Sequence, residues 1–164
     1  MKLLIHKSKG ADLNAIDSMG WTPLTFAVHC DELKIIEFLI TYGGSSDPNY
    51  YDDNQWTPLH RVIADERLDA AKCLIKHGAD INLIDGFGMT PLTTAIKKNN
   101  IKMLKFFIVN GENLLKCTGG GSFPLSIAVK ENHLDMVKVL VGYVASMNIG
   151  DQNGGTPFLG MLRV

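Results

Sequence analysis

The 164-residue chain repeats itself along nearly its whole length. Five proline turns recur at intervals of 35, 33, 33 and 33 residues, at Pro23, Pro58, Pro91, Pro124 and Pro157. A repeat of this size is one supersecondary unit that cannot cover its own apolar face, so neighbouring units stack around a shared core. The period therefore predicts a solenoid, which offers an extended surface rather than a closed pocket.

The residues around each proline predict a turn that leads into a helix. An Asp, or Thr118 in the fourth unit, stands six positions before the proline, and a glycine stands three positions before it in every unit but the second. Such residues favour turns, and proline is tolerated in a first helical turn because its missing N–H has no partner there. A polar break and a second segment with aliphatic residues at helical spacing follow, which predicts two helices per full unit. In the second unit Gln55 replaces the glycine, and we expect Asn54 to adopt the left-handed conformation instead.

Three short motifs identify the kind of repeat. Gly10-Ala11-Asp12-Leu13-Asn14 and Gly78-Ala79-Asp80-Ile81-Asn82 share one ending, and Thr57-Pro58-Leu59-His60 stands at a proline turn. With these motifs the chain resembles the ankyrin-repeat family. The resemblance implies an all-α ankyrin-repeat solenoid of stacked helix-turn-helix units with projecting β-hairpin loops. It also implies that the chain binds other proteins through its loop tips and inner helices.

The repeat pattern predicts a single ankyrin-repeat domain over residues 1–164. It divides into a half-repeat at 1–16, full repeats at 17–51, 52–84, 85–117 and 118–150, and a half-repeat at 151–164. Neither end looks closed, because each reads as only half of a unit, and the C-terminal half-repeat is mostly apolar where a capping repeat would be polar. The chain is then either a segment of a longer array, which is the favoured interpretation, or a complete small protein whose ends associate with each other. We expect a monomer unless those ends associate.

Composition and cysteine usage predict a cytoplasmic protein that does not enter a membrane. The chain has 46% hydrophobic residues, 20% charged residues and a formal net charge of −1, with no long apolar run and no N-terminal signal. The cysteines form neither an even set nor a C-x-x-C pair. Leu74, Leu104 and Cys73 fall on second helices, where we expect them in the core, whereas Cys30 and Cys117 stand at positions that face outward in the family.

No constellation predicts catalysis, a cofactor or a metal. The five histidines form no H-E-x-x-H or similar ligand spacing, and no phosphate-binding loop is present. The third unit is locally basic, at +3, but the second unit is −2 and the whole chain −1. A nucleic-acid-binding surface would carry one sign of charge along its length, so we expect no nucleic-acid partner. Neighbouring patches of opposite charge suit a protein partner, whose identity the sequence does not give.

The ankyrin pattern places its variable outward residues on the loops and at the ends of the first helices. Both tryptophans of the chain fall there, and Trp and Tyr are enriched among residues that dominate interface energies. We expect the loop aromatics to form one ridge, although the two tryptophans could equally pack loop against loop. The expected partner-binding residues are Met19, Trp21, His29, Tyr51, Asp53, Trp56, Asp65, Phe87, Met89, Lys97 and Lys98.

The sequence thus predicts a non-enzymatic protein–protein interaction scaffold. The alternative is a regulatory or spacer segment of a larger multidomain protein, which would make intramolecular contacts. One modification is also expected from resemblance. Asn82 follows Asp80-Ile81 and stands eight residues after Leu74, which resembles the asparagine context that an iron- and oxoglutarate-dependent hydroxylase modifies in many ankyrin proteins. In the alternative interpretation Asn82 only bonds its own loop backbone.

Overall fold

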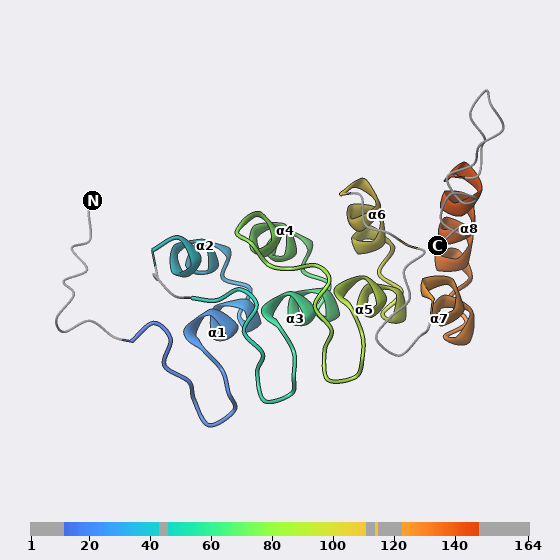
Figure 1. Cartoon of the computed structure of the whole chain (residues 1–164). Coiled ribbons are helices and arrows are strands. Elements are labelled where there is room, and N and C mark those ends of the chain that lie inside the picture. Colours follow the sequence, from blue (N-terminus) through green and yellow to red (C-terminus); the bar gives the residue numbers. More distant parts are fainter. Residues whose placement is uncertain (1–11, 43–45, 111–113, 115–122, 148–164) are drawn as a thin grey trace, which may run out of the picture. The chain divides into compact units, whose positions relative to one another are not determined.

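A computed structural model describes residues 12–42, 46–110, 114 and 123–147 of the chain. The chain consists of two compact units, Met1–Phe87 and Gly88–Val164. The described residues contain eight helices joined by turns, and no strand is found among them (Figure 1). The predicted all-α repeat class, with two helices in each full repeat, is confirmed.

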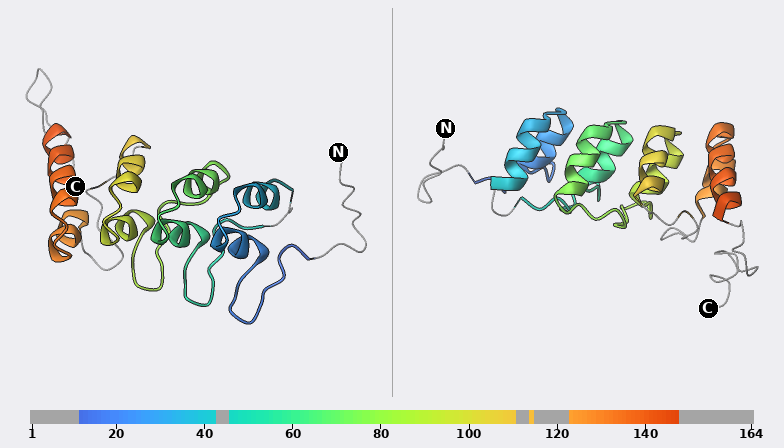
Figure 2. Two further views of the ribbon diagram at one scale, coloured as in Figure 1. Left: turned by 180° about the vertical axis from the view of Figure 1, so that it is seen from behind. Right: turned by 90° about the horizontal axis from the view of Figure 1, so that it is seen from above.

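The first unit contains two helix pairs. They are α1 (Pro23–His29) with α2 (Leu33–Tyr42), and α3 (Pro58–Ala64) with α4 (Leu68–Lys76). Helix α1 contacts α2 and α3, and α2 contacts α4. First helices therefore form one layer and second helices another, and the loops that precede α1 and α3 extend away from both layers (Figures 1 and 2).

The second unit repeats this arrangement. It contains α5 (Pro91–Lys97) with α6 (Ile101–Val109), and α7 (Pro124–Lys130) with α8 (Leu134–Met147). Helix α5 contacts α6 and α7, and α7 contacts α8. None of the described helices of the chain combines the length and the apolar character that crossing a membrane requires.

The first helices begin where the proline turns predict. Thr22, Thr57 and Thr90 are N-cap residues in extended conformation, and each accepts a hydrogen bond from the backbone N–H three residues later. Proline follows directly, so the cap and the missing N–H act at the same helix end. Phe123 stands at the N-cap of α7 and makes no side-chain cap bond, because it has no hydroxyl to accept one.

The left-handed residue of the second turn differs from the prediction. Gln55 itself has a φ of +59°, at the position where Gly20 has +72° and Gly88 has +75°, so the expectation that Asn54 would take this role is wrong. The N–H of Gln55 donates to the carbonyl of Asp52 at 2.8 Å, which closes the turn in the same register as the bond from Gly20 to Asp17 in the first repeat. Position within the repeat, rather than residue type, decides the conformation here.

Each unit has its own apolar core. Leu74 of α4 and Leu104 of α6 are fully buried, as predicted. Cys73 of α4 is only half-buried, so its predicted place in the core is wrong. Burial raises the pKa of the Cys73 thiol, and the nearby carboxylate of Glu37 raises it further.

Candidate interaction surface

An aspartate organises each of the first two loops. The Oδ1 atom of Asp17 accepts hydrogen bonds from the backbone N–H groups of Met19 and Trp21, both at 2.8 Å. Asp52 binds the second loop in the same way, and the N–H of each aspartate donates to the carbonyl of the tryptophan four residues later at 3.0 Å. Each loop is therefore a closed turn with a fixed tip, because its backbone polar groups are satisfied locally.

The third loop continues the pattern and contacts the second. The Oδ1 atom of Asp85 accepts from the N–H of Phe87 at 2.9 Å. The N–H of Gly86 donates to the carbonyl of Gln55 at 3.2 Å, which joins the two tips. The first tip also lies against the second, because a Cβ on Gly20 would lie 2.8 Å from the backbone nitrogen of Asp53. The three loop tips of the first unit therefore form one continuous surface.

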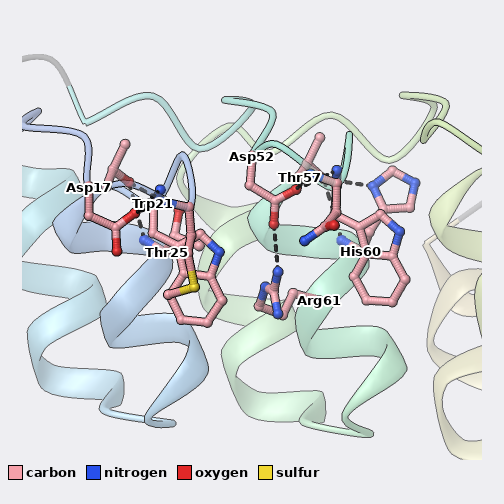
Figure 3. A network of polar contacts seen from close by, with 11 residues as sticks. Asp17, Trp21, Thr25, Asp52, Thr57, His60 and Arg61 are labelled. Carbon is pink, nitrogen blue, oxygen red and sulfur yellow. Dashed lines mark hydrogen bonds and ion pairs between the residues drawn. The ribbon is translucent and has the colours of Figure 1, made fainter.

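Behind these tips, the two tryptophans flank an arginine. The Arg61 guanidinium carbon lies 4.6 Å from the centroid of the Trp21 ring and 5.7 Å from that of Trp56. Its Nη2 atom donates to Oδ2 of Asp52 at 2.5 Å (Figure 3). Both tryptophans are half-buried, and neither indole N–H has a hydrogen-bond partner in the described part of the chain. The expected bare aromatic ridge therefore does not form at these residues. The structure instead places both rings against Arg61 of α3, which differs from the alternative of direct loop-against-loop packing.

Trp21 also packs against its own helix. Its ring centroid lies 5.1 Å from that of Phe26 in an edge-on arrangement and 5.0 Å from that of His29. Tyr51 is half-buried as well, and its hydroxyl donates to the carbonyl of Ile84 at 3.0 Å. Four loop aromatics were expected to form the ridge. Trp21, Tyr51 and Trp56 instead hold the loops in place, and Phe87 is the exposed one of the four.

The other expected residues of the first unit are accessible. Met19 and Phe87 are 49% and 75% exposed, and Asp53 is exposed on the tip between them. His29 and Asp65 are exposed at the ends of α1 and α3. In the second unit Met89 is half-buried, whereas Lys97 and Lys98 are exposed at the end of α5.

Two side-chain contacts between neighbouring repeats were not predicted from the sequence, and each comes from a residue just before a second helix. Nη1 of Arg67 donates to the carbonyls of Val28 and His29, at 2.5 and 2.7 Å, and so binds the end of α1 from the next repeat. In the second unit Nδ1 of His133 donates to the carbonyl of Ile96 at 3.0 Å. Both donors stand immediately before a second helix. A donor at that position is the signal that could have predicted these contacts, because last-turn carbonyls lack partners within their helix.

Asn82 and its counterpart Asn49 occupy similar turns but differ in their side-chain contacts. The N–H of Asn82 donates to Oδ1 of Asp80 at 2.8 Å, and Asn82 is exposed. The side chain of Asn49 instead donates to the carbonyl of Gly78 at 3.1 Å and accepts from the N–H of Asp80 at 2.7 Å. The Asn49 amide is therefore engaged at both ends.

The titratable residues form no metal site in the described part of the chain, since no group of three or more His, Cys, Asp or Glu lies suitably there. Cys30 is exposed, as predicted. Cys117 lies outside the described residues.

Known proteins match the chain in segments. An ankyrin-repeat protein of Fowlpox virus is 36% identical over 81 residues, which is 48% of this chain and 13% of the viral protein. A Saccharomyces cerevisiae protein named "Probable 26S proteasome regulatory subunit p28" is 38% identical over 80 residues, 48% of this chain and 35% of that protein. Mouse protein phosphatase 1 regulatory subunit 27 is 34% identical over 74 residues, 45% of this chain and 47% of the subunit. The matches thus span less than half of each relative.

A family model covers far more of the chain. The model described as ankyrin repeats (3 copies) matches residues 1–85 and 81–153. The stacked helix pairs within each unit and the closed loops between them agree with that match. The chain belongs to the ankyrin-repeat family.

Proposed function

We propose that the chain is a non-enzymatic scaffold of the cytoplasm that binds a protein partner through the loop tips and inner helices of its first unit. Ankyrin repeats are generally protein–protein interaction modules. The observation that carries the proposal is the continuous surface of three loop tips, with two exposed apolar side chains, Met19 and Phe87, and the exposed carboxylate of Asp53.

This surface has the character of a small interface. Exposed apolar groups that adjoin charged ones mark interaction sites, because the centre of an interface excludes water while its rim stays polar. Trp21, Trp56 and Tyr51 contribute by fixing the tips, since a surface that is rigid before binding loses less entropy on binding. His29 and Asp65 extend the surface along the ends of α1 and α3.

The second unit would contribute separately. Lys97 and Lys98 are exposed, and the described residues 88–110 contain four lysines and no acidic residue. Such a basic patch favours a partner that also carries an acidic region, and it would accelerate encounter more than it would tighten the complex. Met89 is half-buried and would have a lesser role.

A regulatory or spacer segment of a larger protein is the second candidate. Two of the relatives carry "regulatory subunit" in their names, and the match to the viral relative covers only 13% of that protein. In that case the same loop surface would bind another domain of the same polypeptide.

Affinity measurement on a captured partner tests the proposal. The immobilised chain would be used to isolate a partner from cell extract, and the partner's affinity would then be measured by calorimetry. Phe87→Ala should weaken binding at least tenfold, because it removes the most exposed aromatic side chain of the tips. Leu134→Ala removes a similarly exposed apolar side chain from α8 and should leave the affinity unchanged. Unchanged affinity in Phe87→Ala, together with weaker binding in Leu134→Ala, would contradict the proposal.

A further inference from the structure

The three loop tips of the first unit present one row of exposed side chains. Met19, Asn54 and Phe87 occupy the same position in successive loops, since each donates its backbone N–H to Oδ1 of the loop aspartate two residues earlier. All three residues are exposed. Along the row the side chains are apolar, polar and apolar, and the closed turns fix the backbone beneath them.

A carboxylate that lacks a cation belongs to the middle tip of this row. The carboxylate of Asp53 lies so close to Gly20 of the first tip that a Cβ there would collide with it. Asp53 is exposed and forms no ion pair within the described residues, whereas its neighbour Asp52 is paired with Arg61. The tip surface therefore carries a negative charge that is held in place but not neutralised.

The acidic character extends through the first unit. Its described residues, 12–42 and 46–87, contain 13 carboxylates and five lysine or arginine side chains, which gives a formal charge of −8. Four of these carboxylates are exposed just beyond the ends of α1 and α3, at Asp31, Glu32, Asp65 and Glu66. A field of this sign attracts a cationic ligand and repels the phosphates of nucleic acid or of an anionic membrane.

We propose that the loop surface binds a basic segment of a protein partner, in which a lysine or arginine is flanked by apolar side chains. The cation would form a charge-assisted hydrogen bond with the carboxylate of Asp53, and the apolar side chains would contact Met19 and Phe87. The inference rests on the proposed function, because it uses the same loop surface, and it names the chemistry of the partner that binds there.

Selection from a phage-displayed library of random peptides tests the partner's chemistry. The full chain would be immobilised, and the affinities of the enriched peptides would be measured by calorimetry. These peptides should be rich in lysine or arginine flanked by apolar residues. Asp53→Lys should weaken the best peptide at least tenfold, because it places like charges together. Asp69→Lys makes the same change of charge on α4, where the aspartate side chain is 75% exposed, and should leave the affinity within twofold.

Two further measurements separate the charge of Asp53 from the shape of the tip. Asp53→Asn keeps the size of the side chain beside Gly20 and should also weaken the peptide. A peptide whose cation is replaced by glutamate should bind Asp53→Lys more tightly than it binds the wild-type chain, because the charges are then complementary again.

The outcomes distinguish this inference from the proposed function. Peptides that Phe87→Ala weakens but both Asp53 variants leave unchanged would overturn the basic segment and leave the loop surface as the binding face. Peptides that none of these variants weakens would contradict both. Failure to enrich basic peptides would also overturn the inference. So would an affinity that falls as the protein concentration rises, because a second copy of the chain would then be the occupant.

Discussion

The guanidinium of Arg61 lies 4.6 Å from the ring centroid of Trp21, although the two residues belong to neighbouring repeats. Asp52 of the second loop forms an ion pair with the guanidinium, and the ring centroid of Trp56 lies 5.7 Å from the guanidinium carbon. A single side chain of α3 thus connects both tryptophan-bearing loops. The relationship explains why these tryptophans are half-buried although they occupy loop positions.

Replacement of Arg61 should destabilise the first unit strongly. The side chains of Arg61 and Asp52 are only 14% and 1% exposed, so Arg61→Met would leave a buried carboxylate without its cation. Loss of one partner of a buried pair costs about 3–5 kcal/mol. Urea unfolding followed by tryptophan fluorescence measures it, because both tryptophans lie in this unit. Lys72→Met, which breaks an exposed pair with Asp69, should cost less than about 1 kcal/mol. If Arg61→Met and Lys72→Met lowered the unfolding free energy equally, the pair of Arg61 and Asp52 would contribute no more than an exposed ion pair.

Arg67 should stabilise the contact between the first two repeats. Arg67→Ala removes two hydrogen bonds from a charged donor to the end of α1, and such bonds contribute about 1.5–3 kcal/mol. Arg67→Lys should restore part of the loss, because an ammonium supplies the charge without the planar fork. The same fluorescence-detected unfolding measures both variants. A lysine variant no better than the alanine variant would show that the charge at the helix end is unimportant.

Much of the fold was predictable from the sequence, because local chemistry recurs in every repeat. The threonine caps, the proline turns and the buried leucines all follow from short-range patterns. The exposure of the loop aromatics was not predictable in this way. It depends on Arg61, which stands in a different element from Trp21, and periodicity does not report where a long side chain reaches. The conformation of Gln55 was missed for a related reason, since turn register outweighed the preference of Asn54.

The core register can be tested directly. Leu74 is fully buried in the first unit, so Leu74→Ala should cost about 2–5 kcal/mol of unfolding free energy. Lys105→Ala alters an exposed residue and should cost less than about 0.5 kcal/mol. Circular dichroism during urea unfolding compares the two variants, and Leu104→Ala supplies the corresponding core change in the second unit. A Leu74 variant as stable as the Lys105 variant would contradict the repeat register.

Asn82 should be a substrate for an asparagine hydroxylase of the iron- and oxoglutarate-dependent class, whereas Asn49 should not. Asn82 is exposed, but the amide of Asn49 is held by Gly78 and Asp80. Peptide mass analysis after incubation should show one added oxygen on the Asn82 peptide only. An unmodified Asn82 peptide would contradict the prediction. Equal modification of Asn49 would show that its side-chain hydrogen bonds do not protect it from hydroxylation.

Hydrogen–deuterium exchange of the chain with and without its captured partner tests the central proposal most directly. The partner should slow exchange at the tips of the first three loops, where the amides of Met19, Asn54 and Phe87 are bound only by the loop aspartates. Exchange in the second helices α2 and α4 should not change. Protection confined to α2 and α4, with unchanged loop tips, would contradict the assignment of the loop surface as the partner-binding face.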